Sequence, residues 1–227
     1  MIIFVQNNFN MKKRIIAAVL IIFSFALNAM NEESLLGDTN KTDANNLRQG
    51  FWKESISGIE IQGNYMNNKK EGVWVGHHPN GMLSTMDVYK NGMKNGISTA
   101  TDKNGYILRE ENYLNDTLDG LSKIYSSGAK LKSETNYKMG KLHGIKKLHY
   151  SDGKLQEEGY YKNGNTQSEG TYKNNELDGV YNEYYESGKL KITGTYAKGK
   201  KHGLWKELSE EGKVMKTEKY KSGELAK

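Results

Sequence analysis

The chain has 227 residues, of which 36% are hydrophobic, and it contains 25 glycines but a single proline. This composition is too polar for a thick globular core, yet 15 tyrosines argue against plain disorder, which is poor in aromatic residues. Abundant glycine with almost no proline indicates many tight turns joined by regular strands. There is no cysteine, so a secreted form would hold its fold without disulfides.

The first segment in chain order has the pattern of an export signal. The basic group Lys12–Arg14 precedes the apolar run Ile15–Leu27, whose 13 residues fall short of the roughly 20 that a membrane-spanning helix needs. Small residues at its end predict cleavage near Ala29, so residues 1–29 are interpreted as a helical signal peptide. Translation from Met11 and an uncleaved membrane anchor are the alternatives. We therefore expect an exported protein, either periplasmic or secreted, and the missing cysteine argues against lipid attachment.

Cleavage would change the charge of the chain. The signal carries three basic residues and no acidic one, so the formal net charge falls from +6 to +3 in the mature protein. Only Arg48 and Arg109 remain as arginines, and arginine is the preferred reader of phosphates and base edges. Nucleic acid is thus a poor candidate partner. Residues 30–48 are polar and aperiodic, which predicts a disordered leader.

A 24-residue period dominates the rest of the chain. Tyrosines recur at Tyr65, Tyr89, Tyr113, Tyr137 and Tyr161, then at Tyr172, Tyr196 and Tyr220. One glycine series opens the units, at Gly50, Gly72, Gly96, Gly120, Gly144, Gly179 and Gly203. A second series lies inside them, at Gly58, Gly81, Gly105, Gly128, Gly153, Gly188 and Gly212. Such self-similarity at a fixed period is the signature of a repeat protein.

Each unit reads as a β-hairpin. In "EGVWVGHHPNGMLSTMDVYKNG" a strand follows Gly72, turns at Asn80-Gly81, and returns from Leu83 to Tyr89 before a second turn at Asn91-Gly92. Counting by two places Leu83 and Tyr89 on one face of the return strand. No segment between residues 50 and 227 has a useful helical period. The predicted fold is all-β, an elongated single-layer antiparallel meander over residues 49–227.

The pattern G-x-W-x-x-Y-x-x-N-G-x-L, followed by Y-x-N-G-x-x-x-G, resembles the MORN-repeat variant family. It is clearest in "HGLWKELSEEGKVMKTEKYKSG" and "LDGVYNEYYESGKLKITGTYAKGKKHG". The resemblance covers about seven and a half repeats over residues 49–227. The resemblance implies the repeat fold, and its bacterial branch often bears an antitoxin-like label. Ser98, Ser122 and Lys146 stand where tryptophan stands in other units, so we expect few aromatic side chains in the middle repeats.

The period is broken once. Tyr161 and Tyr172 are 11 residues apart, and both precede turn residues, so one outgoing strand is missing near residues 162–172. In a meander each turn reverses the chain, and one odd strand should move all later inner turns to the opposite long edge. A bulged excursion from the sheet is the alternative, and it would keep the original phase.

Groups that carry chemistry are sparse. His143 and His202 precede opening glycines and are interpreted as polar turn residues, while His77 and His78 should face opposite sides of a strand. Paired glutamates alternate with lysines, as on a solvated surface. There is no nucleophile elbow, phosphate loop or dinucleotide fingerprint. We therefore expect no enzyme activity, no cofactor and no metal site.

These observations favour a non-catalytic, exported repeat scaffold that binds an unknown protein or envelope component through an aromatic-lined sheet face. The alternatives are an antitoxin-like protein that neutralises a partner toxin, and a membrane- or phospholipid-associating MORN protein, although the charge of +3 attracts an anionic membrane weakly. The sequence leaves the oligomeric state open. The candidate aromatic residues of the ladder and binding face are Trp52, Trp74, Tyr89, Tyr113, Tyr137, Tyr161, Tyr172, Tyr196, Trp205 and Tyr220.

Overall fold

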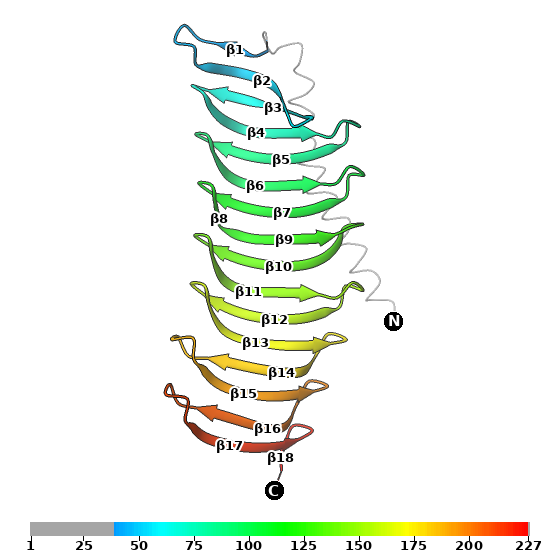
Figure 1. Cartoon of the computed structure of the whole chain (residues 1–227), viewed down its shortest axis with the longest axis vertical. Helices are drawn as coiled ribbons and strands as arrows, with labels where there is room; N and C mark the ends of the chain where they lie inside the picture. Colours follow the sequence, from blue (N-terminus) through cyan, green and yellow to red (C-terminus); the bar gives the residue numbers. More distant parts are fainter. Residues whose placement is uncertain (1–38, 227) are drawn as a thin grey trace, which may run out of the picture.

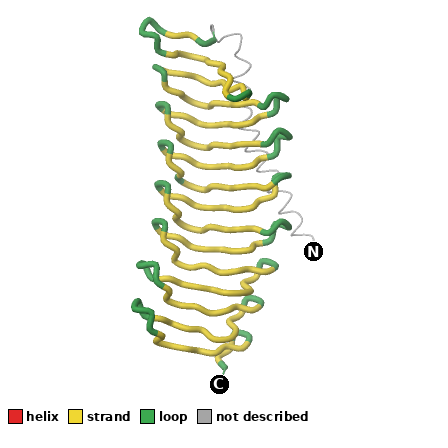
Figure 2. The backbone as a smooth tube through the Cα atoms, viewed as in Figure 1, coloured by secondary structure: helices red, strands yellow, loops and turns green. Residues whose placement is uncertain are grey.

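Residues 39–226, which the computed structural model describes, form one open antiparallel β-sheet (Figure 1). Successive strands pair with each other along the chain, and these residues contain no helix (Figure 2). The predicted all-β, single-layer meander is therefore confirmed, whereas the predicted helical signal segment lies outside the described residues. Within residues 39–226 no helix is long and apolar enough to cross a membrane.

The sheet has 18 strands. They are β1 (Lys41–Thr42), β2 (Arg48–Ile56), β3 (Ile59–Met66), β4 (Lys69–His77), β5 (Leu83–Lys90), β6 (Met93–Thr101), β7 (Ile107–Leu114), β8 (Thr117–Leu118), β9 (Gly120–Ser126), β10 (Lys130–Lys138), β11 (Lys141–His149), β12 (Leu155–Lys162), β13 (Asn165–Lys173), β14 (Glu176–Tyr184), β15 (Leu190–Ala197), β16 (Lys200–Leu208), β17 (Val214–Lys221) and β18 (Glu224–Leu225).

Two-residue turns join the hairpins to each other because their residues accept left-handed backbone angles. Asn91 and Gly92, between β5 and β6, have φ values of 54° and 86°, and Asn67 and Asn68 have 52° and 64°. A type I′ turn needs positive φ at both central positions, which asparagine and glycine tolerate best. The recurring Asn-Gly pairs are thus the turns that the sequence predicts.

Residues 39–48 are ordered, which corrects the prediction that the leader is disordered as far as residue 48. The Asp43 carboxylate accepts the backbone N–H groups of Asn45 and Leu47 at 2.8 and 3.0 Å, and this turn brings β1 back against β2. Asn40 continues the pairing, since its backbone N–H donates to the Phe51 carbonyl at 3.0 Å. The segment covers part of a sheet edge that would otherwise expose unpaired backbone groups.

The half-repeat is a complete strand. β13 pairs with β12 on one side and with β14 on the other, so one full-length strand stands between the hairpin β11–β12 and the hairpin β14–β15. The turns β4–β5, β6–β7 and β11–β12 lie at one long edge, here called the first edge, whereas β14–β15 and β16–β17 lie at the second edge (Figure 1). The inner turns change edges, as the 11-residue spacing of Tyr161 and Tyr172 predicts.

The extra strand also exchanges the two faces of the sheet. Directly paired residues of antiparallel strands point to the same face, so a face can be followed from strand to strand. From Trp74 the face passes through the pairs Trp74–Asp87, Asp87–Ser98 and Ser98–Glu111. Arg109 pairs with Ile124, and these residues lie two positions from Glu111 and Ser122 on their strands, so the same face continues at Ser122. The remaining pairs are Ser122–Thr135, Thr135–Lys146, Lys146–Gly159, Gly159–Glu169, Glu169–Asn182, Asn182–Thr193 and Thr193–Lys206. Lys206 thus shares the face of Trp74, here called the first face, and its neighbour Trp205 points to the second face.

Rotation explains this exchange. A hairpin that starts in the opposite direction and still extends the sheet the same way must be turned by 180° about the long axis of the ribbon. That rotation swaps both the edges and the faces. Equivalent residues of the repeats before and after β13 therefore lie on opposite sides of the same layer.

Candidate functional site

The ten predicted aromatic residues fall into two groups on opposite faces, which corrects the expectation of one aromatic-lined face. Six lie on the first face, namely Trp52, Trp74, Tyr89, Tyr113, Tyr137 and Tyr161. Four lie on the second face, namely Tyr172, Tyr196, Trp205 and Tyr220. The half-repeat is the cause, because it turns over every unit that follows β13.

The first-face ladder consists of Trp52, Tyr65, Trp74 and Tyr89, whose rings meet edge to face. The ring centroids of Tyr65 and Trp74 are 4.9 Å apart, and those of Trp74 and Tyr89 are 6.5 Å apart. The Lys70 ammonium lies 4.0 Å from the Trp74 ring centroid, which is the geometry of a cation–π contact. This ladder covers β2 to β5.

The second-face ladder consists of Tyr181, Tyr196, Trp205 and Tyr220, and it repeats that geometry. Tyr196 and Trp205 are 5.1 Å apart, and Trp205 and Tyr220 are 6.3 Å apart, between ring centroids. Lys201 lies 4.2 Å from the Trp205 ring centroid, as Lys70 lies over Trp74. The protein thus carries two copies of one surface element, at opposite ends of the ribbon and on opposite faces.

Both tryptophans belong to the packed part of the sheet. Trp74 is 3% exposed and Trp205 is 5% exposed, and each indole N–H donates at 3.1 Å to a backbone carbonyl, of Asn64 and Thr195 respectively. A β-carbon at Gly63 would overlap the Trp74 ring. The indole therefore lies flat over a glycine of the neighbouring strand.

Sequence reasoning missed this glycine, although a signal for it exists. In four units a glycine stands two residues before the ladder tyrosine, at Gly63, Gly159, Gly170 and Gly194. Gly194 lies under Trp205, and Gly170 lies beside Tyr181. Absence of a side chain at this position marks the units in which an aromatic ring lies on the sheet.

We expect Gly63→Ala to lift the Trp74 ring from the sheet and to destabilise the protein by about 1–3 kcal/mol, the usual cost of overpacking. Tryptophan fluorescence should shift to the red as the indole meets water, and thermal unfolding gives the stability loss. Gly58→Ala is the control, because Gly58 has open space around it and a φ of 79°. It should strain the backbone and leave the emission unchanged. An unshifted spectrum for Gly63→Ala would contradict the packing described above.

The middle repeats are polar on the first face, as their sequence predicts. Ser98 is 2% exposed in the place of a tryptophan, and its hydroxyl donates to the Asp87 carboxylate at 2.5 Å. Lys94 forms an ion pair with the same carboxylate at 2.8 Å. Small and charged side chains therefore separate the aromatic residues of the first face in these repeats.

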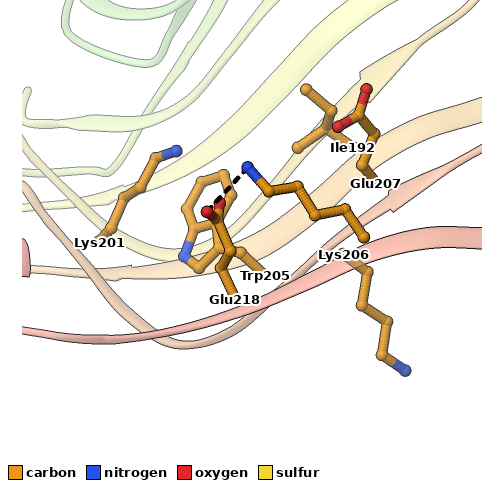
Figure 3. Close-up of a pocket in the computed structure, with 7 residues that line it drawn as sticks. Ile192, Lys201, Trp205, Lys206, Glu207 and Glu218 are labelled. Carbon is orange, nitrogen blue, oxygen red and sulfur yellow. Dashed lines mark ion pairs between the residues drawn. The ribbon is translucent and has the colours of Figure 1, made fainter. Parts of the chain in front are cut away.

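A shallow hollow lies beside the second-face ladder (Figure 3). Figure 3 shows Lys201 to one side of the Trp205 ring and Glu218 in front of the ring, and Glu218 forms an ion pair with Lys216 at 2.8 Å. The lining residues are Ile192, Lys201, Trp205, Lys206, Glu207, Lys216 and Glu218. The hollow thus combines an aliphatic side chain, an indole and several charged groups, and it is open to solvent.

One of the histidines, His143, has a structural role at a turn. The backbone N–H of Asn163 donates to His143 Nδ1 at 3.5 Å, and that of Met139 donates to the equivalent Asp119 carboxylate at 3.0 Å. Residues that precede an opening glycine therefore accept a hydrogen bond from the next turn along the same edge, which explains their polarity. Among residues 39–226 no group of three or more His, Cys, Asp or Glu side chains could hold a metal ion.

Several tyrosine hydroxyls have raised pKa values because they are partly buried and face carboxylates. Partial burial, with Glu169 as hydrogen-bond partner, raises the pKa of Tyr184 to about 12. Partial burial and the nearby Asp87 raise the pKa of Tyr89 to about 12, and burial and Glu183 do the same for Tyr181. Protonated tyrosines therefore belong to the folded state.

We expect alkaline unfolding as a consequence. A group whose pKa is higher in the folded state than in the unfolded state stabilises the fold fully below the unfolded pKa, about 10 for tyrosine. That stability is lost as the pH rises from about 10 to about 12. Urea titrations at increasing pH should show it, and Tyr184→Phe should make the decline less steep. A free energy of unfolding that stays flat to pH 12 would contradict this.

Taken together, an open single-layer sheet, tandem hairpins and a recurring Tyr/Trp ladder define a solenoid-like β-repeat protein. Four segments match the MORN repeat variant family, residues 142–163, 157–174, 177–198 and 201–222. The family model thus matches four tandem repeats, in agreement with the sequence resemblance. The second match spans β13, which places the half-repeat inside the family pattern. A search of curated proteins found no match to the chain.

Proposed function

We propose that this protein is a non-catalytic, exported scaffold that binds a partner protein, or another component of the cell envelope, along its aromatic ladders. The observation that carries the proposal is the second-face ladder, where an ammonium lies across an indole in a hollow open to solvent. A MORN-repeat scaffold is suited to such binding because neighbouring repeats build one extended surface. The pattern of residues 1–29 supports export.

The chemistry of the hollow favours an acidic partner segment. Lys201 is held over the Trp205 ring, so a partner carboxylate can pair with the ammonium while the indole stays covered. Ile192 offers an aliphatic contact beside it. A carboxylate next to an aliphatic or aromatic side chain would satisfy both features.

Affinity capture from envelope extract tests the proposal. We expect Lys201→Glu to reduce capture of the partner by about tenfold, because it reverses the charge over the ladder. Lys219→Glu is the matched control, since it makes the same charge change on the neighbouring strand β17, where Lys219 pairs with Leu204, faces away from the hollow and is not among its lining residues. Equal capture by both variants would place the partner elsewhere, and turnover of a substrate by the purified protein would refute a purely binding role.

A further inference from the structure

A second apolar feature lies on the other side of the N-terminal repeats. The residue after each opening glycine points to the second face there, and so does its partner on the next strand. The resulting cross-strand pairs are Phe51–Asn64, Val73–Val88, Ile97–Asn112, Leu121–Asn136 and Ile145–Tyr160. We call these ten residues the apolar stripe. It runs across the strands from β2 to β12 and contains no charged residue.

The stripe is open to solvent. Val73, Ile97, Ile145 and Tyr160 are 43%, 40%, 44% and 46% exposed, although each lies in the middle of a paired strand. The apolar side chains of an isolated soluble domain are normally scattered when they are exposed, whereas contiguous ones mark interaction sites.

Two of the three asparagines of the stripe bond the backbone of the neighbouring strand through their side chains. The Asn112 side-chain amide donates to the Leu121 carbonyl at 2.7 Å, and the Asn136 amide donates to the Ile145 carbonyl at 2.8 Å. One N–H group of each of these two amides is thus already paired with the backbone of the next strand. A partner can bury these two N–H groups without leaving them unsatisfied.

The stripe widens toward the second edge. Met66, Met93 and Leu114 are on the same face and are exposed, two to four residues beyond the stripe on their strands. Methionine adapts its shape to a partner surface. Exposed lysines alternate with these residues along that edge, at Lys69, Lys90, Lys138 and Lys141.

Nearby carboxylates compensate these lysines only in part. The carboxylates of Glu71 and Asp119 accept the backbone N–H groups of Asn91 and Met139, at 2.8 and 3.0 Å. Their oxygens are thus directed at turns of the second edge. A partner that carries acidic residues along this flank would complement the lysines.

We propose that the apolar stripe docks an acidic amphipathic helix of a partner protein, with its axis along the ribbon. Each repeat spans two strands, about 9.6 Å, and a helix rises 1.5 Å per residue, so apolar residues spaced six to seven apart would meet successive repeats. Such a spacing is close to a heptad. The helix diameter of about 10 Å suits the width between the stripe and the second edge.

Two other occupants fit less well. In a symmetric dimer, two copies could pack with their apolar stripes in contact. If the two-fold axis ran across the ribbon, the lysines of the second edge of one copy would lie against the same lysines of the other copy. A lipid surface would have to accept Glu110, Glu134 and Glu158, which lie on the same face beside the stripe. A helix is narrow enough to cover the stripe and leave these carboxylates in water.

The half-repeat supplies an internal control. After β13 the equivalent positions Val180 and Leu204 point to the first face, and they are 53% and 57% exposed. On the second face the series of directly paired residues that contains the stripe continues beyond Tyr160 with the polar residues Ser168 and Glu183. Leu204 therefore has the same place in its repeat as Ile97, without belonging to the stripe.

The test uses labelled helical peptides of about four heptads, with leucine at the apolar positions and either glutamate or lysine at the others. We expect the full chain to bind the glutamate peptide about tenfold more tightly than the lysine peptide. The variant Ile97→Asp with Ile145→Asp should lose about tenfold in affinity for it, and Leu204→Asp should bind like the wild type. Circular dichroism and thermal unfolding confirm that each variant is folded.

Three outcomes would overturn the proposal: equal binding of both peptides, self-association that Ile97→Asp abolishes, or binding to anionic vesicles without binding of the glutamate peptide. The stripe is separate from the aromatic ladders. Lys201→Glu should leave peptide binding unchanged while it weakens partner capture, so failure of the two proposals can be told apart.

Discussion

Replacing Trp74 by alanine should unfold the repeats around β4 and leave the C-terminal repeats intact. Its indole is 3% exposed, lies over Gly63 and contacts Tyr65, Tyr89 and the ammonium of Lys70. Loss of such a side chain costs about 3–5 kcal/mol. In a repeat array each unit touches only its neighbours, so the loss should be local.

Hydrogen exchange measured along the chain checks this. Amides of β2 to β6 should exchange faster in Trp74→Ala, and those of β14 to β17 should keep their protection. Val73→Ala is the control, because Val73 is the adjacent residue, points to the other face and is 43% exposed. It should change exchange little. Uniform loss of protection over all repeats would show that the ribbon unfolds as one unit.

The architecture follows from the sequence because local signals repeat. Asn-Gly pairs such as Asn91-Gly92 fix the turns, and alternation sets the strands. The order of the inner turns along the edges also follows, since it depends only on counting strands between Tyr161 and Tyr172. No long-range information enters these inferences.

The candidate site was predicted less well, for a geometric reason. The period identifies Trp74 and Trp205 as equivalent residues, and equivalence suggests a common face. Whether the two tryptophans share a face depends on whether the number of strands between them is even or odd. The one additional strand, β13, rotates the later units. Burial depends in addition on Gly63 and Gly194, which lie on the preceding strand and in another part of the period. The ordered structure of residues 39–48 depends on side chains such as Asp43 and Asn40. These residues lie outside the repeats, so the 24-residue period gives no information about them.

Deleting residues 163–173 should return Trp205 to the face of Trp74. The deletion joins Lys162 to Asn174-Asn175, so Tyr161 is followed by the same kind of turn as Tyr65, which precedes Asn67-Asn68. The 24-residue period is then unbroken between Tyr161 and Tyr196. Since β13 and one turn are removed together, the remaining strands can pair as whole hairpins, and we expect the variant to fold.

Spin labels decide the outcome, because the chain has no cysteine that would compete for labelling. In the wild type, labels at Asp152 and Ser187 lie on opposite edges, separated by strands of about nine residues, or about 30 Å. In the deletion variant both labels should lie on the first edge two strands apart, about 10 Å. A control pair at Asn104 and Asp152 shares the first edge in both proteins and should not change. If the Asp152–Ser187 distance stays near 30 Å after deletion, the extra strand is not what turns over the later repeats, and the two faces of the ribbon are set by the individual units.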